Sequence, residues 1–363
     1  MSEPIRVLHV ITGMGSGGAE SFLMNMYRNI DRTKVQFDFL LCSDENIYAD
    51  ELEHMGSRVY YIDKYTRHPM RNKLQTRAFL LEHAYPVVHV HANALLNVTP
   101  LIEAKKAGVP VRIMHSHSTR TAKQFLKPLH WFNRLLLHRW CTDCFACSAD
   151  AGVWMFLDSF IKIHNAIDID GFGFATENRI QMRRGLNISD HSFVLGHIGR
   201  FLPVKNHLFI LQVFRTILSE CPDAVLVLVG DGPLEEEIRA EARKAGIADR
   251  VRFLGVRKDV GKLLSALDAF IFPSLYEGLG IVMVEAQANG LPVFCSEAVP
   301  KEAFITDSVV HLPLESGPEE WARRILTSRR TEHDAKACLT DAGYDIHTEA
   351  KRLQDFYMMK VRS

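Results

Sequence analysis

The sequence has no excess of charge of either sign, because its 363 residues include 43 Lys and Arg and 43 Asp and Glu. Without a net field that would attract a polyanion, we expect no nucleic acid among its partners. No apolar run approaches the roughly 20 residues that span a bilayer. The N-terminus also lacks the basic start, long apolar stretch and small-residue cleavage site of a signal peptide. These absences predict a cytoplasmic protein, in which the seven cysteines stay reduced.

A complete set of ligands for a structural metal is missing as well. Cys141, Cys144 and Cys147 have the CxxCxxC spacing of a metal or cluster site, but no fourth Cys or His follows at a finger-like spacing. The stretch 144–148 is typical of a short buried strand, on which Cys144 and Cys147 would point to opposite faces. We therefore predict structural roles for these cysteines and no metal site.

The sequence does have a regular alternation of strand-like and helical segments. Short apolar runs rich in β-branched residues predict strands at 6–11, 87–91, 111–115, 194–198, 224–230, 252–254, 269–273 and 293–295. Helical patterns lie between them, for example at 19–27, 98–107 and 234–245. Such alternation is typical of parallel sheets with crossover helices, so the sequence predicts an α/β fold.

The chain is long enough for two domains, since a single core stops growing at about 250–300 residues and 47% of the residues are hydrophobic. We place a linker at 166–190, after the last apolar element of the first half. The first domain then covers 1–165 and the second covers 191–346. Two Rossmann-like, doubly wound sheets facing each other across a cleft would bind ligands at the carboxyl ends of their strands.

Two glycine-containing loops between a predicted strand and a predicted helix are suited to phosphate binding. Gly13-Met-Gly-Ser-Gly-Gly-Ala-Glu20 lets backbone amides approach a ligand at a helix N-terminus, but a tight structural turn explains this motif equally well. The second loop, 199–206, carries Arg200 and Lys205, which together would bind a diphosphate. Two solvated surface charges are the simpler interpretation of any such pair.

A third loop is more specific. In Pro273-Ser-Leu-Tyr-Glu-Gly-Leu-Gly280-Ile-Val-Met-Val-Glu285, a strand ends, a glycine-rich turn follows, and a helix begins near Gly280. The free amides at that helix N-terminus would hold a phosphate. Glu277 on the loop and Glu285 in the helix have the spacing E-x7-E, and both suit acceptors of hydrogen bonds from sugar and ribose hydroxyls.

Together these motifs resemble the retaining glycosyltransferases of family 4, which have the GT-B fold. The resemblance covers nearly the whole chain and includes the stretches 165–168, 229–233 and 253–255. The chain is similar in particular to glycosyltransferases of bacterial exopolysaccharide and capsule biosynthesis. The resemblance implies transfer of a hexose-type sugar from a nucleotide diphosphate sugar, expected to be a UDP-sugar, to a glycan or lipid-linked acceptor.

The resemblance also implies a role for each matching residue. Arg200 and Lys205 would neutralise the diphosphate, Glu277 would contact the donor sugar, and Glu285 would bind the ribose hydroxyls. The other donor contacts would come from Gly17, Gly18, Gly255, Val256, Arg257, Leu279, Gly280 and Ile281. His117 matches a position that contacts the donor sugar near the reacting carbon. We prefer it to His115, because it lies closer to the strand end, although each of them also fits a structural histidine.

The mechanism that the resemblance implies is metal-independent, with no cofactor besides the nucleotide sugar. Arg200, Lys205 and a helix N-terminus would stabilise the charge of the departing diphosphate. No side-chain nucleophile is assigned, and the departing phosphate would help to deprotonate the acceptor. Asp168-Ile-Asp170 imitates the DxD metal motif of another glycosyltransferase fold but belongs to the hinge pattern, so we interpret it as structural. A C-terminal helix within 347–363 would return to the first domain.

The stretch 119–140 contains no acidic residue. Apolar side chains recur there at helical spacing, opposite a basic set, Lys123, Lys127 and Arg134. The apolar set is Phe125, Leu129, Phe132, Leu136 and Trp140. Either this apolar face packs on the first domain, or the segment docks on an anionic membrane near a lipid-linked acceptor. The second alternative would make the protein peripheral on the inner face of the membrane.

Two other functions stay open. A nucleotide-sugar epimerase or hydrolase of the same fold would need a water-activating or proton-abstracting set, which the sequence does not reveal. A non-catalytic nucleotide-sugar sensor would lack part of the catalytic set, and no part is visibly missing. An NAD-dependent dehydrogenase would have no use for the E-x7-E pair.

Overall fold

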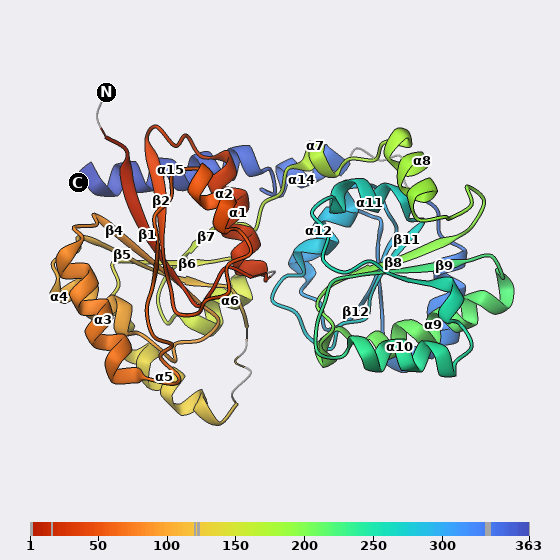
Figure 1. The fold of residues 1–363 in the computed structure, drawn as a ribbon, viewed down its shortest axis with the longest axis horizontal. Coiled ribbons are helices and arrows are strands. Elements are labelled where there is room, and N and C mark those ends of the chain that lie inside the picture. The colour runs from red at the N-terminus through yellow and green to blue at the C-terminus, as the bar shows by residue number, and fades with distance from the viewer. Residues whose placement is uncertain (1–2, 16, 120, 122–123, 331–334, 363) are drawn as a thin grey trace. The chain divides into compact units, whose positions relative to one another are not determined.

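The computed structural model describes residues 3–15, 17–119, 121, 124–330 and 335–362, which form two compact units. The first unit is built from Met1–Ala166 and Asp345–Ser363, and the second is Ile167–Tyr344. Figure 1 shows the first unit in red to yellow with the blue C-terminal helix, and the second in green to blue. Each unit has one parallel sheet with helices on both faces, as expected for a doubly wound fold.

The sheet of the first unit has seven strands in the order β3-β2-β1-β4-β5-β6-β7, and its pairs are all parallel. Their bounds are β1 Ile5–Ile11, β2 Val35–Leu41, β3 Val59–Tyr61, β4 Val87–Ala92, β5 Val111–Ser116, β6 Asp143–Ala146 and β7 Ile161–Lys162. Alternate residues of a strand enter opposite cores, so Val7 packs in one apolar cluster and Leu8 in the other.

Two helical layers cover this sheet. Helices α1, Gly18–Asn29, α2, Ala49–His54, and α15, Ile346–Arg362, supply one core. The opposite core contains side chains of α3 Pro69–Glu82, α4 Thr99–Lys106, α6 Ala149–Met155 and the turn after α5 Lys127–Leu136. Helix α15 is the only chain segment from beyond residue 344 in the first unit, and its buried Leu353 and Tyr357 explain why it lies there.

The sheet of the second unit has six strands in the order β10-β9-β8-β11-β12-β13. They are β8 Val194–Ile198, β9 Val225–Val229, β10 Val251–Phe253, β11 Ala269–Phe272, β12 Val293–Ser296 and β13 Val309–Leu312. One face carries α9 His207–Glu220, α10 Glu235–Lys244 and α13 Gly317–Leu326. The other carries α7 Ile169–Phe172, α11 Val260–Ala266, α12 Ile281–Ala288 and α14 Ala335–Asp341. Helix α8 Thr176–Gly185 packs beside α11.

The stretch predicted as a linker, 166–190, belongs almost wholly to the second unit. Arg183 on α8 is fully buried, and its guanidinium donates to the Asp268 carboxylate at 2.7 Å and to the carbonyl of Ala266 at 3.0 Å. Arg179 donates to the same carboxylate at 2.7 Å. A buried guanidinium must keep such partners, so this stretch is held on the sheet and does not act as a free connection.

The Asp268 carboxylate gives a test of this attachment. Asp268→Ala should lower the free energy of unfolding by about 3 kcal/mol, because it leaves buried Arg183 without its anion. Asp170→Ala is the matched control, since the Asp170–Lys336 ion pair has side chains 73% and 61% exposed and should contribute less than about 1 kcal/mol. Urea denaturation of both variants measures the difference. Equal losses in the two variants would contradict the anchoring role of Asp268.

Candidate functional site

The strand-to-helix turn after β11 forms the core of the predicted donor site in the second unit. Gly280 is the N-cap of α12 in a left-handed conformation, with φ 79° and ψ 59°. A Cβ at this position would lie 3.0 Å from the Phe272 ring, so only glycine fits the turn without strain. The amides of Ile281 and Val282, at the start of α12, have no intrahelical acceptor and can bind an anion, whereas the next amide, of Met283, donates to the carbonyl of Gly280 at 2.8 Å.

The loop after β8 meets this turn. Leu275 donates its backbone N–H to the carbonyl of Val204 at 2.8 Å. The Lys205 ammonium lies 2.5 Å from the Glu277 carboxylate and 4.5 Å from the centre of the Phe272 ring. Both charged side chains are largely buried, with exposed fractions of 17% and 12%. Lys205 and Glu277, predicted separately as cation and sugar acceptor, are therefore one ion pair.

Arg200, on the same loop as Lys205, is in a different state. Its side chain is 50% exposed and lies 3.8 Å from Asp231, whose side chain is also exposed. An exposed pair at this distance contributes little to stability. Arg200 is therefore free to reorient toward an anionic ligand.

Glu285 projects from the second turn of α12. Burial raises the pKa of its carboxyl from 4.5 to about 7. Among the described residues, no cation and no hydrogen-bond donor contacts this carboxylate. A partly buried carboxylate without a partner in the protein is suited to accept hydrogen bonds from the hydroxyls of a ligand.

The predicted base-binding residues follow β10. Gly255 has φ 63° and its carbonyl accepts a hydrogen bond from the N–H of Gly230 at 2.9 Å. Val256 is 51% exposed, which leaves an apolar surface at the strand end. The Arg257 guanidinium is engaged by Asp259 at 2.8 and 2.6 Å, so this side chain is less available than the prediction assumed.

In the first unit, Gly17 caps α1 and Gly18 begins it. A Cβ added at Gly18 would meet no atom within 4 Å, whereas one at Gly17 would lie 2.4 Å from the Glu20 carboxylate. Gly18 thus borders open space at the positive end of a helix, which is suited to an anion. The Glu20 carboxylate lies close to the same helix end.

His117 follows β5 and is part of a histidine array that the sequence did not predict as a unit. Its Nε2 lies 2.8 Å from Nδ1 of His91, and Nε2 of His91 lies 2.9 Å from Nδ1 of His9. Burial lowers the pKa of His117 and of His9 to about 3, so both imidazoles are neutral at physiological pH. His115 is fully buried, whereas His117 is partly exposed, so only His117 is accessible from the strand end.

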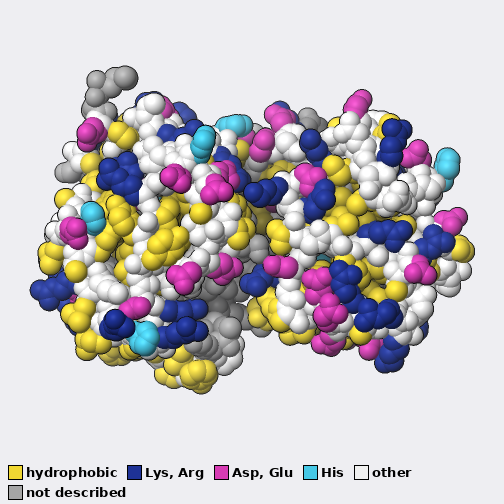
Figure 2. All heavy atoms as spheres, viewed as in Figure 1, with side chains coloured by type: hydrophobic (Ala, Val, Ile, Leu, Met, Phe, Trp, Pro, Cys, Tyr) yellow, Lys and Arg dark blue, Asp and Glu magenta, His cyan; other side chains and the backbone are white. Residues whose placement is uncertain are grey.

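Helix α5 has its polar side chains inward. His130 and Asn133 are buried, and they bond to the backbone N–H and carbonyl of Leu95 at 3.0 and 2.7 Å. The exposed apolar surface consists of Phe125, Leu129, Trp131, Phe132 and Leu135. Figure 2 shows apolar side chains at the surface over this part of the first unit. Of the predicted apolar face, Phe125, Leu129 and Phe132 are exposed, whereas Leu136 is half-buried and Trp140 packs against the apolar cluster of the first unit, so only the C-terminal end of this face packs on the domain.

Two of the basic residues opposite that apolar set are described, and Lys123 lies outside the described residues. Lys127 is exposed. Arg134 donates to the carbonyls of Val153 and Phe156 and lies over the Trp131 ring, so it holds α5 in place. In the described parts of the chain, no helix is long and apolar enough to cross a membrane.

Among the described residues, no cysteine belongs to a group of three or more potential metal ligands. Sγ of Cys141 and Sγ of Cys144 lie 3.7 Å apart. Cys144 and Cys147 pack against the same apolar cluster and not on opposite faces, because β6 ends at Ala146. Asp168 accepts a hydrogen bond from the N–H of Gly171 at 3.1 Å and so caps α7.

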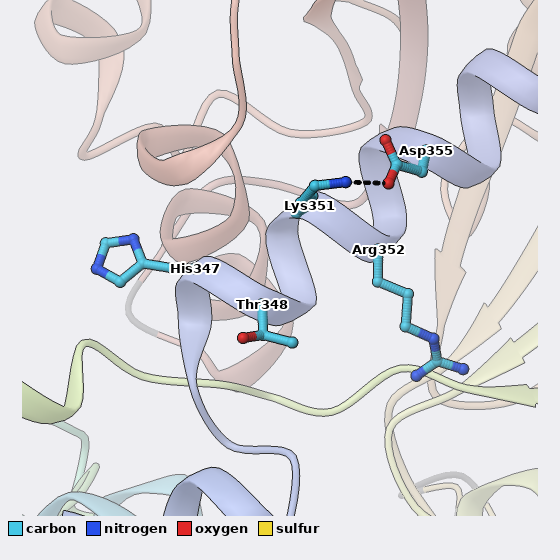
Figure 3. A pocket seen from close by; sticks show the side chains of 5 residues that line it. All are labelled: His347, Thr348, Lys351, Arg352 and Asp355. Carbon is cyan, nitrogen blue, oxygen red and sulfur yellow. Dashed lines mark hydrogen bonds and ion pairs between the residues drawn. The ribbon is translucent and has the colours of Figure 1, made fainter.

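A pocket of about 560 Å³ lies elsewhere, on α15 (Figure 3). It is lined by His347, Thr348, Lys351, Arg352 and Asp355. All five side chains are exposed, and Lys351 is paired with Asp355 at 2.6 Å. None of the predicted site residues lines this pocket, and its charges are already paired along one helix, so we assign it no function.

Comparison with known proteins covers both units. Residues 178–336 match a family model described as "Glycosyl transferases group 1", and residues 17–152 match a "Glycosyl transferase 4-like domain". EpsF of Bacillus subtilis (strain 168) is 34% identical, over 97% of this chain and 96% of its own. The capsular polysaccharide biosynthesis glycosyltransferase CapH of Staphylococcus aureus is 26% identical, over 98% and 99%.

A relative with a more specific name is the UDP-Gal:alpha-D-GlcNAc-diphosphoundecaprenol alpha-1,3-galactosyltransferase of Escherichia coli, which is 27% identical over 72% of each chain. Among solved structures, Anabaena HepE in complex with UDP and glucose superposes with a TM-score of 0.81 at 20% identity, over 98% of this chain and 99% of its own. This likeness confirms the predicted fold of two Rossmann-like domains. The chain belongs to the family 4 glycosyltransferases of the GT-B fold.

Proposed function

We propose that this glycosyltransferase moves a hexose-type sugar from a UDP-sugar to a glycan or lipid-linked acceptor in surface polysaccharide biosynthesis, with retention of configuration. The observation that carries the donor assignment is the turn before α12. Glu277, the first amides of α12 and Glu285 all follow β11, and Lys205 follows the neighbouring strand β8. The names of the relatives support the donor and acceptor classes, since one acts from UDP-Gal on a diphosphoundecaprenol-linked sugar.

The charges of the site suit a departing nucleoside diphosphate. The helix amides and the two cations Arg200 and Lys205 would stabilise negative charge as it develops on the leaving group. In the free protein, Glu277 neutralises Lys205. A bound diphosphate would compete for that ammonium and would release the Glu277 carboxylate to accept hydrogen bonds from the donor sugar. This exchange couples phosphate binding to sugar binding without a metal ion.

Retention requires attack from the face that the leaving group occupies. No side-chain nucleophile is needed if the departing phosphate oxygen takes the proton of the acceptor hydroxyl as the new bond forms. In this proposal the partly exposed ring of His117, whose Nε2 is bonded to His91, contacts the donor sugar. Glu285 would hold the ribose, and residues 255–257 would contact the base.

The exposed surface of α5 supports a second proposal, docking of the first unit on an anionic membrane. Five large apolar side chains of α5 and of the turn before it are 38–78% exposed, which is the arrangement expected for an interfacial helix. Lys127 adds a positive charge beside them. The inward face of α5 is polar, and His130 and Asn133 on it are hydrogen-bonded to the protein. Rotating the helix to bury its apolar face would leave these two side chains without their hydrogen-bond partners.

Release of nucleoside diphosphate from UDP-, GDP- and ADP-sugars tests the proposed reaction, with and without membrane lipid extract and in EDTA. We expect extract-dependent release from one donor, unaffected by EDTA.

Glu285→Ala should lower kcat/KM about 10- to 100-fold, because a charged hydrogen bond contributes about 1.5–3 kcal/mol. The control Glu220→Ala, at an exposed position, should leave kcat/KM unchanged. Release without any acceptor would favour a hydrolase, binding without turnover would favour a sensor, and an unaffected Glu285→Ala variant would contradict the donor site.

The raised pKa of Glu285 predicts a pH-dependent cost in stability. The folded protein holds this proton up to about pH 7, whereas the unfolded chain loses it near pH 4.5, so the free energy of unfolding falls as pH rises between these values. Glu285→Gln should therefore be more stable than the wild type at pH 8, by up to about 3 kcal/mol, and equal to it at pH 4. Urea denaturation at both pH values measures this. Glu220→Gln should differ little at either pH, and no gain at pH 8 for Glu285→Gln would show that its carboxylate is well solvated.

Flotation with vesicles rich in phosphatidylglycerol tests the membrane proposal. Replacing both Phe125 and Phe132 by Ser should lower the partition coefficient at least about 10-fold, since each buried aromatic side chain contributes more than about 1 kcal/mol. Leu81→Ser is the matched control, because Leu81 is 65% exposed on α3 of the same unit. Undiminished binding of the double variant would exclude α5 as the anchor.

A further inference from the structure

Five histidines line one face of three adjacent strands in the first unit. They are His9 on β1, His89 and His91 on β4, His115 on β5, and His117 just after β5. The parallel register pairs His9 with His89 and His91 with His115. The rings face the core that contains α1 and α15, because Phe22 and Tyr357 contact them. Residues from distant parts of the chain therefore form one array of imidazoles.

Three of these histidines form a hydrogen-bonded chain. Nε2 of His117 lies 2.8 Å from Nδ1 of His91, and Nε2 of His91 lies 2.9 Å from Nδ1 of His9. The far end of the chain, Nε2 of His9, is buried without a hydrogen-bond partner. His91 thus uses both of its ring nitrogens to connect His117, at the strand end, with His9, in the core.

The three rings are neutral, which makes the directions of their hydrogen bonds depend on one another. Burial lowers the pKa of His9 and of His117 to about 3, and it also lowers the pKa of His91. A neutral imidazole has one N–H and one acceptor nitrogen. Because His91 must donate to one neighbour and accept from the other, both hydrogen bonds point the same way along the chain. The far end at His9 therefore sets the position of the proton on His117.

The surroundings of His9 favour one of the two directions. Its ring lies among the rings of Phe37 and Phe39, with centroid distances of 4.1 and 5.7 Å. The face of an aromatic ring is negative, so it attracts an N–H and repels a nitrogen lone pair. A proton on Nε2 of His9 leaves Nδ1 as the acceptor for His91, which in turn accepts from His117. His117 accordingly carries its proton on Nε2 and donates it to His91.

Packing and hydrogen bonding together fix the ring of His117. The ring stacks on that of His115 at a centroid distance of 4.2 Å, and the ring of Phe22 lies 5.4 Å away. The backbone N–H of His117 donates to the carbonyl of Ala92 at 3.1 Å. Rotation of the ring within this stack would break its bond to His91 and leave a buried N–H without an acceptor. The bond to His91 therefore selects one orientation of the ring.

We propose that His91 and His9 are positioning residues, which hold His117 in the ring orientation and the tautomer that the donor sugar meets. This inference rests on the proposed function, in which His117 contacts the donor sugar. Such a group has to be held accurately, because misplacement by about 1 Å can lower the rate of the chemical step about 100-fold. His91 and His9 act through His117 and do not touch the substrate.

Two substitutions of His91 separate its two hydrogen bonds. The amide of Asn begins at Cγ, so its oxygen can take the place of Nδ1 and accept from His117, whereas the longer Gln reaches toward His9 in place of Nε2. His91→Gln should lower kcat at saturating donor about 10- to 100-fold, and His91→Asn should lose much less. Release of nucleoside diphosphate measures both values. Equal losses in the two variants would contradict the proposal.

A double-mutant cycle distinguishes positioning from a general loss of structure. Once His117→Ala has removed the group that His91 holds, adding His91→Gln should lower kcat no further, whereas losses that multiply would overturn the proposal. Tyr357→Phe is the control for a buried change in the array. The Tyr357 hydroxyl bonds at 2.7 Å to His89, outside the chain that ends at His117, so this variant should keep the wild-type kcat. Circular dichroism shows whether each variant is folded.

The result for His117→Ala separates this inference from the proposed function. An unchanged kcat in His117→Ala would contradict the contact with the donor sugar, and positioning would then have no object. If His117→Ala lowers kcat and His91→Gln does not, the contact stands and the positioning role is wrong.

NMR of the ring nitrogens tests the hydrogen-bonded chain without substrate or turnover. We expect the proton of His117 on Nε2 in the wild type and in His91→Asn, and a mixture of tautomers in His91→Gln. A proton on Nδ1 of His117 in the wild type, or the same single tautomer in all three proteins, would overturn the role of the chain.

Discussion

The end of a parallel strand, where the chain turns into a helix, is the place on which each candidate site depends. Because β8 and β11 are adjacent and parallel, the loops that follow them meet at one sheet edge. This brings Lys205 and Glu277, which are 72 positions apart, to within 2.5 Å. Close approach needs glycine at the turns: a Cβ at Gly230 would lie 2.2 Å from the carbonyl oxygen of Gly199, and one at Gly232 would lie 2.6 Å from that of Phe201.

This arrangement places charged side chains at positions that are largely or partly buried. Lys205 and Glu277 offset each other, but Glu285 has no counter-ion among the described residues, and its raised pKa records the resulting cost. Arg183 in the same unit is more deeply buried, yet it is satisfied by Asp268 and several carbonyls. The contrast distinguishes a charge that holds the fold from one that is held ready for a ligand.

Much of this edge could be predicted from sequence. Strand β8 has the bounds predicted for it. The predicted β9 is one residue too long at each end and the predicted β11 one residue too long at its C-terminal end, because continuous Val-, Leu- and Phe-rich runs admit few alternatives. The orientation of α5 could not be predicted, since its apolar spacing alone favours burial. Only the position of the Leu95 backbone shows why His130 and Asn133 face inward. The ion pair of Lys205 and the contacts of Arg257 likewise depend on tertiary distances.

The histidine array illustrates the same limit. The alternation of His89 with His91 and of His115 with His117 is visible in the sequence, and it indicates a shared strand face for each pair. What the sequence hides is the strand order β1-β4-β5, which adds His9 from residues far upstream. Apolar side chains of similar volume would pack this core without orphaned nitrogens and with greater stability. Cores that break such a local rule tend to do so at sites with a function, and the open end of this array at His117 lies where the first unit presents its strand ends.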